Sequence, residues 1–129
     1  MKKIKSFIFA ICLSITLLVT SVFYNIKLEE LSSRLSETVN DITANLHNED
    51  FISASESTKK LEDEIKNLEV FFASTGNHQE IDNIEMSLAE LKKYIEGQQK
   101  YDALAKSQVL DFLFHHLPKN SRLKTENIF

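Results

Sequence analysis

Hydrophobic and polar residues follow two different patterns along this chain. Residues 6–26, SFIFAICLSITLLVTSVFYNI, contain no charged side chain, whereas the later residues place apolar side chains three or four positions apart among charged ones. At 1.5 Å of rise per residue, a helix of the first kind covers about 30 Å, the hydrocarbon thickness of a bilayer. The pattern predicts a transmembrane helix from Ser6 to Ile26, followed by a helical domain over residues 27–129.

The charges that flank this segment predict its orientation. Three lysines lie within residues 1–5, whereas Lys27 is followed closely by two glutamates. Basic residues stay on the cytoplasmic side of a membrane, and aromatic residues such as Tyr24 favour the interface. We therefore expect a single-pass protein of the cytoplasmic membrane, with residues 1–5 inside and the domain at 27–129 outside.

A cleaved secretory signal is the alternative interpretation of the same segment. A basic start and an apolar run are common to both, and Val19-Thr20-Ser21 weakly matches a cleavage site. The uncharged run is longer than a usual signal core, which favours an uncleaved signal anchor. Cys12 is the only cysteine, so no disulfide forms within one chain.

The rest of the chain shows four apolar stripes with helical spacing. Helices are expected over residues 27–46, 50–72, 78–95 and from residue 100 to Pro118, with the anchor running directly into the first. The stripe positions are Leu28, Leu31, Leu35, Val39, Ile42 and Leu46; Phe51, Ala54, Thr58, Leu61, Ile65, Leu68 and Phe72; Ile81, Ile84, Leu88, Leu91 and Ile95; and Ala103, Leu104, Leu110, Leu113, Phe114 and Leu117.

Short polar sequences separate the stripes and predict the turns. Asn48 or Asp50 is the expected N-cap of the second helix, because its side-chain oxygen accepts from an exposed backbone amide. Gly76 and Gly97 lie in the next two turns, and Pro118 is expected to stop the fourth helix.

Four amphipathic helices with short connections favour an all-α, up-down antiparallel four-helix bundle, because every stripe needs burial and short loops make neighbours antiparallel. A long coiled-coil homodimer is the rival architecture. Turns at Gly76, Gly97 and Pro118 argue against it, since they interrupt the heptads.

Charge narrows the range of partners. Twelve basic and nineteen acidic residues give residues 27–129 a formal charge of −7. Nucleic acids and anionic lipid surfaces bind proteins through clustered basic residues and repel an acidic domain. We therefore expect no nucleic-acid partner. Most of the acidic residues are expected simply to solvate helix faces.

Catalytic motifs are absent from the sequence. It contains no Gly-rich phosphate loop, no H-E-x-x-H and no nucleophile elbow, and its one cysteine lies in the apolar segment. We expect no enzyme activity and no cofactor.

One group of five polar residues is a candidate binding site. His78, Asp82 and Glu85 share one helix face, and an antiparallel fourth helix returns His115 and His116 to the same end of the bundle. Imidazoles and carboxylates on facing helices bind divalent metals, although this spacing selects no particular metal. A structural or interfacial role for these five residues is the favoured interpretation, a metal or small-ligand site comes second, and a hydrolase third.

The same region carries a resemblance to a known family. The segments HQEIDNIEMSLAELKKYIEG and YDALAKSQVLDFLFHHLP, with LKTENIF near the end, resemble the bacterial family known as domain of unknown function 4363. The resemblance implies an N-terminal membrane span, a helical exterior domain and an H-x-E-I-D-x-I-E-x-S-L-x-x-L-x-x-Y-I segment, which matches residues 78–95. It implies no established activity. Residues 107–109, SQV, depart from the family pattern.

Together these patterns predict a noncatalytic, membrane-anchored accessory protein. Residues 6–26 would contact the lipid bilayer, and the expected partner is a larger membrane protein or a second copy of the chain. Four small polar positions, Ser14, Thr16, Thr20 and Ser21, are suited to helix packing in the membrane, or equally to lipid. The alternative is an extracytoplasmic ligand- or metal-binding sensor that uses His78, Asp82, Glu85 and His115.

Overall fold

The computed structural model describes residues 1–73 and 78–128, with side chains as far as Leu117, and this part of the chain forms four α-helices. They are α1 (Lys2–His47), α2 (Phe51–Ala73), α3 (His78–Glu96) and α4 (Lys100–Ile128). Except at the start of α1 and the end of α4, the helix boundaries lie within two residues of those that the apolar stripes predicted.

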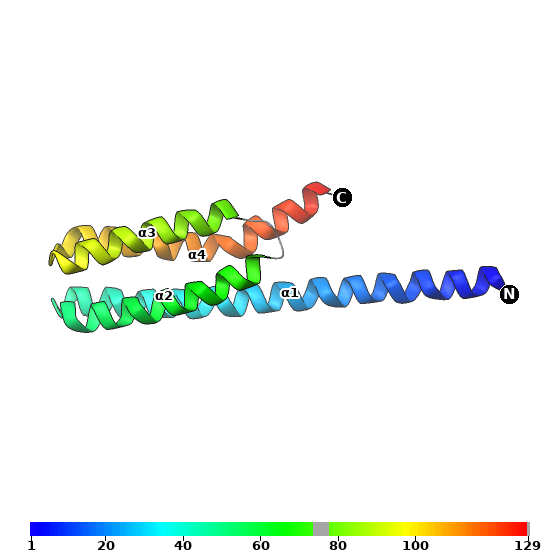
Figure 1. Ribbon diagram of the computed structural model, residues 1–129, viewed down its shortest axis with the longest axis horizontal. Coiled ribbons are helices and arrows are strands. Elements are labelled where there is room, and N and C mark those ends of the chain that lie inside the picture. Colours follow the sequence, from blue (N-terminus) through cyan, green and yellow to red (C-terminus); the bar gives the residue numbers. More distant parts are fainter. Residues whose placement is uncertain (74–77, 129) are drawn as a thin grey trace.

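The helices form an up-down-up-down bundle (Figure 1). Helix α1 packs against α2 and α4, and α3 packs against the same two helices, so α1 and α3 lie at opposite corners. Each helix runs antiparallel to the next one in the chain. The predicted all-α bundle is therefore confirmed.

Helix α1 extends well beyond the bundle. Its 46 residues form one uninterrupted helix, and the first side chain to be buried in it is that of Leu28. The N-terminal part projects away from the other three helices (Figure 1). The predicted direct continuation of the apolar segment into the first bundle helix is confirmed.

The core consists of the predicted stripes. Nearly all of the expected positions are buried, and Leu31, Phe51, Leu104 and Leu113 are partly buried at its edge. Hydroxyl side chains join the core at five positions that apolar spacing alone did not include: Ser32, Ser36, Thr38, Ser87 and Ser107.

The two turns farthest from the apolar segment have the same geometry. In each, a backbone N–H bonds back five residues to close the helix: Asp50 N to Asn45 O at 2.9 Å and Gln99 N to Tyr94 O at 2.9 Å. This is the Schellman closure, which needs one residue with positive φ. That residue is Glu49 (φ 55°) in the first turn and Gln98 (φ 52°) in the second, so Gly97 itself does not take the left-handed conformation.

Asp50 also caps the N-terminus of α2. Its Oδ1 accepts from the backbone N–H of Ser53 at 3.1 Å, which confirms Asp50 as an N-cap residue. Hydrogen bonding from Ser53, first through its side chain and then through its backbone N–H, lowers the pKa of the Asp50 carboxyl. The third turn, where Gly76 was expected to close α2, lies outside the described residues.

The prediction that Pro118 ends the fourth helix is wrong. Helix α4 continues to Ile128 and changes direction in its last third (Figure 1). A proline inside a helix removes one hydrogen bond and clashes with the preceding turn, which bends a helix without having to end it.

Aromatic side chains mark the junction between the bundle and the projecting part of α1. The Tyr24 ring stacks on the Phe71 ring at a centroid distance of 4.6 Å, and Phe71 meets Phe72 edge to face at 5.7 Å. These contacts tie the end of α2 to the end of the apolar segment. The start of α3 and the last part of α4 lie at this same end of the bundle (Figure 1).

Candidate functional site

Three of the five predicted site residues come together. His78, Asp82 and Glu85 line a shallow depression of about 280 Å³ between the start of α3 and the end of α2, where Glu69 and Phe72 complete the wall. The helical spacing therefore placed them correctly on one face. His78, Asp82 and Glu85 are all exposed.

The two other predicted residues lie elsewhere. The imidazole of His115 faces α1, with its Nδ1 3.3 Å from Ser36 Oγ and its Nε2 3.8 Å from Asp111 Oδ2. The His116 ring stacks on Phe112 at 4.0 Å, and its Nδ1 lies 2.8 Å from the Phe112 carbonyl oxygen. Both histidines are thus engaged on sides of α4 away from the depression.

The expected convergence of all five residues is therefore wrong. Among the described residues, no group of three or more His, Cys, Asp or Glu side chains is arranged to hold a metal ion. The physical reason is the register of α4. Phe114 and Leu117 occupy its core positions, and this turns His115 toward α1 instead of α3.

Ser36, His115 and Asp111 are the residue types of a hydrolase triad, but their geometry does not support catalysis. The 3.8 Å between His115 Nε2 and Asp111 Oδ2 is too long for a hydrogen bond. Ser36 lies in the interior of α1, where backbone N–H groups are committed to the helix and cannot stabilise an oxyanion. The three side chains instead connect α1 with α4.

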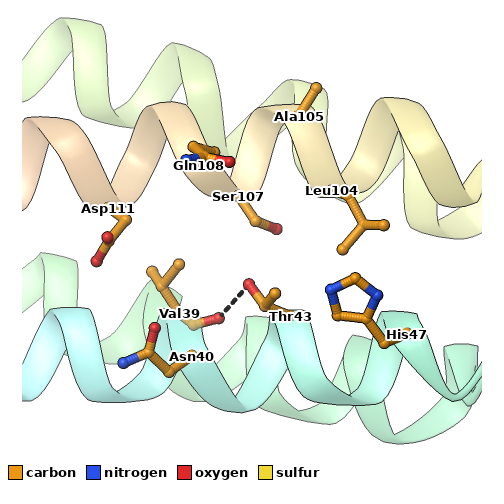
Figure 2. Close-up of a pocket in the computed structure, with 9 residues that line it drawn as sticks. All are labelled: Val39, Asn40, Thr43, His47, Leu104, Ala105, Ser107, Gln108 and Asp111. Carbon is orange, nitrogen blue, oxygen red and sulfur yellow. Dashed lines mark hydrogen bonds between the residues drawn. The ribbon is translucent and has the colours of Figure 1, made fainter.

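A second hollow lies between α1 and α4 (Figure 2). It is a groove of about 320 Å³, and we call it the α1/α4 groove. Helix α1 contributes Val39, Asn40, Thr43 and His47 to its lining. Helix α4 contributes Leu104, Ala105, Ser107, Gln108 and Asp111.

Polar groups dominate the middle and one end of this groove. Ser107 is fully buried and Thr43 partly buried, and their side chains extend toward each other from the two helices (Figure 2). The Asp111 carboxylate points toward α1 near Asn40, whereas His47 lies at the other end beside Leu104 (Figure 2). Asp111 Oδ1 is buried without a hydrogen-bond partner, a property that it shares with Glu80 Oε2 elsewhere.

The sequence reasoning missed this groove, although one signal was available. The core positions of α4 are Ala103, Ser107, Leu110, Phe114 and Leu117, in alternating steps of four and three. Ser107 is thus a serine at a position where the pattern requires an apolar side chain. A small polar residue at such a position leaves both space and a polar group at the helix interface.

The outer face of α4 differs from those of the other helices. Tyr101, Ala105, Val109, Phe112 and His116 fall within about a quarter-turn of one another at the 100° step of a helix. Among the α4 side chains that the structure describes, as far as Leu117, this face carries no acidic or basic one other than His116. The large members are 80% (Tyr101), 41% (Val109) and 59% (Phe112) exposed. We call these five residues the α4 face.

The N-terminal part of α1 has the properties of a membrane-crossing helix. It is long and apolar enough to span a bilayer, and no part of its most apolar window is buried in the bundle. That exposure distinguishes it from the core helix of a globular protein. A membrane span and a signal sequence both have this length and composition.

Comparison with known proteins identifies the family but no function. A four-helix bundle with a long apolar N-terminal extension defines the architecture. Residues 22–128 match the family described as Domain of unknown function (DUF4363), and the chain belongs to that family. No curated protein and no solved structure matches the chain.

Proposed function

We propose that the protein is a noncatalytic interaction protein, anchored in the cytoplasmic membrane by residues 6–26 with its bundle outside, that binds a larger integral membrane protein through the α4 face. The single observation that carries this proposal is the α4 face itself. Large apolar side chains exposed in a row on one helix are typical of protein-binding surfaces.

The position of the α4 face favours a partner in the same membrane. Helix α4 runs back toward the apolar part of α1 (Figure 1), so the α4 face comes nearer to that part along its length. Because α1 is one continuous helix, the bundle is held rigidly at a fixed distance from residues 6–26. A protein in the same bilayer would lie beside the bundle and contact the α4 face.

The charge of the bundle also supports the α4 face as the binding surface. The formal charge of −7 over residues 27–129 opposes association with acidic surfaces, and the α4 face is the strip where an apolar partner meets no carboxylate. The three basic residues within residues 1–5 support the proposed orientation.

Site-specific photocrosslinking in living cells tests this proposal. A photoreactive amino acid replaces Phe112 in the full chain, and in a matched control it replaces Lys66, which is exposed on α2. We expect one integral membrane protein, identified by mass spectrometry, to be crosslinked from position 112 and not from position 66.

A second pair of variants makes the result specific. Phe112→Asp should abolish co-purification of that same protein, because it places a charge in the centre of the apolar strip, whereas Lys66→Asp should leave it intact. Crosslinks from position 112 to lipid or to the chain itself alone would refute the proposal. The mass of the membrane-extracted protein would also show whether residues 6–26 are retained.

A further inference from the structure

The two hydroxyl groups in the middle of the α1/α4 groove act as hydrogen-bond acceptors toward it, and the side-chain donors of its lining belong to Asn40, Gln108 and His47. The Thr43 hydroxyl donates to Val39 O at 3.0 Å, as Figure 2 shows, and the Ser107 hydroxyl donates to Ala103 O at 2.9 Å. A hydroxyl has one hydrogen and two lone pairs. With its hydrogen committed to its own helix, each of these two oxygens offers only lone pairs to the groove.

Asp111 adds a negative charge to this acceptor lining. Its Oδ1 is buried and unpaired, while its Oδ2 lies 3.8 Å from His115 Nε2, beyond hydrogen-bonding distance. A buried carboxylate oxygen without a donor is unfavourable, because it has lost water and gained no partner. The side chain as a whole is 34% exposed and lines the groove, so a ligand in the groove contacts the carboxylate through its exposed atoms.

We propose that the α1/α4 groove binds a small compound with a primary ammonium group. An ammonium carries three donors and a positive charge, which match the Asp111 carboxylate and the neighbouring hydroxyl acceptors. The body of the ligand lies between Thr43 and Ser107, against the apolar side chains of Val39 and Leu104. Terminal hydroxyl or amide groups of the ligand find polar partners in Asn40 and Gln108.

The ligand is a soluble amine and not the ammonium headgroup of a lipid. Asn40 lies fourteen residues beyond Ile26, which is about 21 Å along the helix axis. A headgroup at the end of the apolar segment does not reach that far. The acidic bundle also concentrates small cations from solution. The groove shares Ala105 with the α4 face, but Asp111, Thr43 and Ser107 lie outside that face.

Calorimetric titration of the full-length protein in detergent micelles tests the site. The probe is 4-aminobutan-1-ol, and butane-1,4-diol is its uncharged counterpart of similar length. We expect saturable binding of the amine at millimolar concentrations or below, and none of the diol. Asp111→Asn should weaken amine binding at least about tenfold, because it removes the charge-assisted hydrogen bond.

The matched control is Asp102→Asn, which removes the same charge from an exposed position on α4 outside the groove. It should change the affinity by less than about twofold, as expected for a solvent-screened charge. Thr43→Val removes an acceptor while keeping the side-chain shape. It should weaken binding by about threefold to tenfold, the usual range for one neutral hydrogen bond, and it provides a second test if Asp111→Asn does not fold.

Several results would overturn the proposal. They are the absence of saturable binding of the amine, equal binding of the diol, or equal losses in Asp111→Asn and Asp102→Asn. A final comparison uses nanodiscs with and without phosphatidylethanolamine. Equal amine affinity in both supports a soluble ligand, whereas weaker amine binding in the presence of that lipid would assign the groove to a lipid headgroup.

Discussion

The two parts of helix α1 have similar hydroxyl residues but use them differently. In the apolar part, Ser14 donates to Ala10 O at 2.9 Å and Thr16 donates to Cys12 O at 2.8 Å, both within the helix. In the bundle part, the Ser32 hydroxyl donates to the Phe114 carbonyl oxygen of α4.

The difference lies in what each hydroxyl can reach. In the part of the chain that the structure describes, the apolar part of α1 has no buried side chain and no helix beside Ser14 or Thr16, so its hydroxyl groups bond to the carbonyl four residues earlier, as Thr43 does in the bundle. Inside a bundle, the same residue types can reach a neighbouring helix, as Ser32 does and as Thr38 does with Glu64 on α2 at 2.8 Å. Only in the bundle part of α1 do these hydroxyl groups bond to a neighbouring helix.

The largest expected contrast is between two isoleucines of α1. Ile42 is fully buried in the bundle, whereas Ile15 is 55% exposed in the apolar part. Ile42→Ala should lower the free energy of unfolding by about 2–5 kcal/mol through lost burial and a cavity. Ile15→Ala should leave bundle unfolding unchanged. Guanidinium unfolding in detergent, followed by circular dichroism, measures the free energy of unfolding of both variants. Equal losses would contradict the difference between the two parts of α1.

The hydroxyl groups provide the next contrast. Ser32→Ala should lower the free energy of unfolding by about 1–2 kcal/mol, because it removes a donor from the buried Phe114 carbonyl, to which Pro118 has no N–H to offer. Ser14→Ala should have no effect on the bundle, since its bond stays within its own helix. The same unfolding assay applies, and a loss for Ser14→Ala would mean that the apolar part packs on the bundle.

The bundle end farthest from the apolar segment can be stabilised. Gln98→Gly should raise the free energy of unfolding by about 1 kcal/mol, because the left-handed conformation at φ 52° is unfavourable for a residue with a Cβ. Gly97→Ala is the control. A Cβ there meets Lys93 O at 3.5 Å, an ordinary contact, so we expect a change below about 0.5 kcal/mol. A larger effect at Gly97 would contradict the turn geometry.

The smallest expected effect concerns the charged surface of the bundle, which the apolar part of α1 lacks. Lys92 Nζ lies 2.8 Å from Glu62 Oε2, and this hydrogen bond lowers the pKa of the Glu62 carboxyl below its usual 4.5. Because the folded-state pKa is lowered, the stabilisation is complete above pH 4.5 and is lost as the pH falls through the folded-state value.

Both side chains of this pair are more than a third exposed, so solvent limits the contribution to about 0.5 kcal/mol or less. Glu62→Gln should flatten the pH dependence of the midpoint of thermal unfolding between pH 3 and 6 relative to the unmodified protein. Asp63→Asn, at an exposed neighbouring position, is the control for the change in net charge. An identical pH profile for Glu62→Gln and the unmodified protein would contradict the assignment.

The fold was predictable because its main determinant is periodic. Steps of three and four between Leu28 and Leu46, and again between Ile81 and Ile95, select the buried side of each helix without knowledge of its neighbours. The end of α4 was missed because the effect of Pro118 depends on whether the next residues find helical support, which local rules do not describe.

The candidate site was less predictable because it depends on how the helices face one another. Spacing correctly placed His78, Asp82 and Glu85 together. It did not show that His115 would face Ser36 on α1. The α1/α4 groove was missed because it joins residues of ordinary type from helices that are far apart in sequence. Ser107, at a core position of α4, was the available sign.

One labelling measurement tests the central claim most directly, which is that α1 is a single helix with one part in the membrane and one part in an exterior bundle. In a Cys12→Ser background, Ile15→Cys and Ser33→Cys each place one cysteine at an exposed position of α1. Both variants are reconstituted in lipid vesicles and treated with a water-soluble, membrane-impermeant maleimide. We expect rapid labelling at position 33 and protection at position 15. Equal labelling at both positions would show that the apolar part of α1 lies in water and would contradict the membrane anchor.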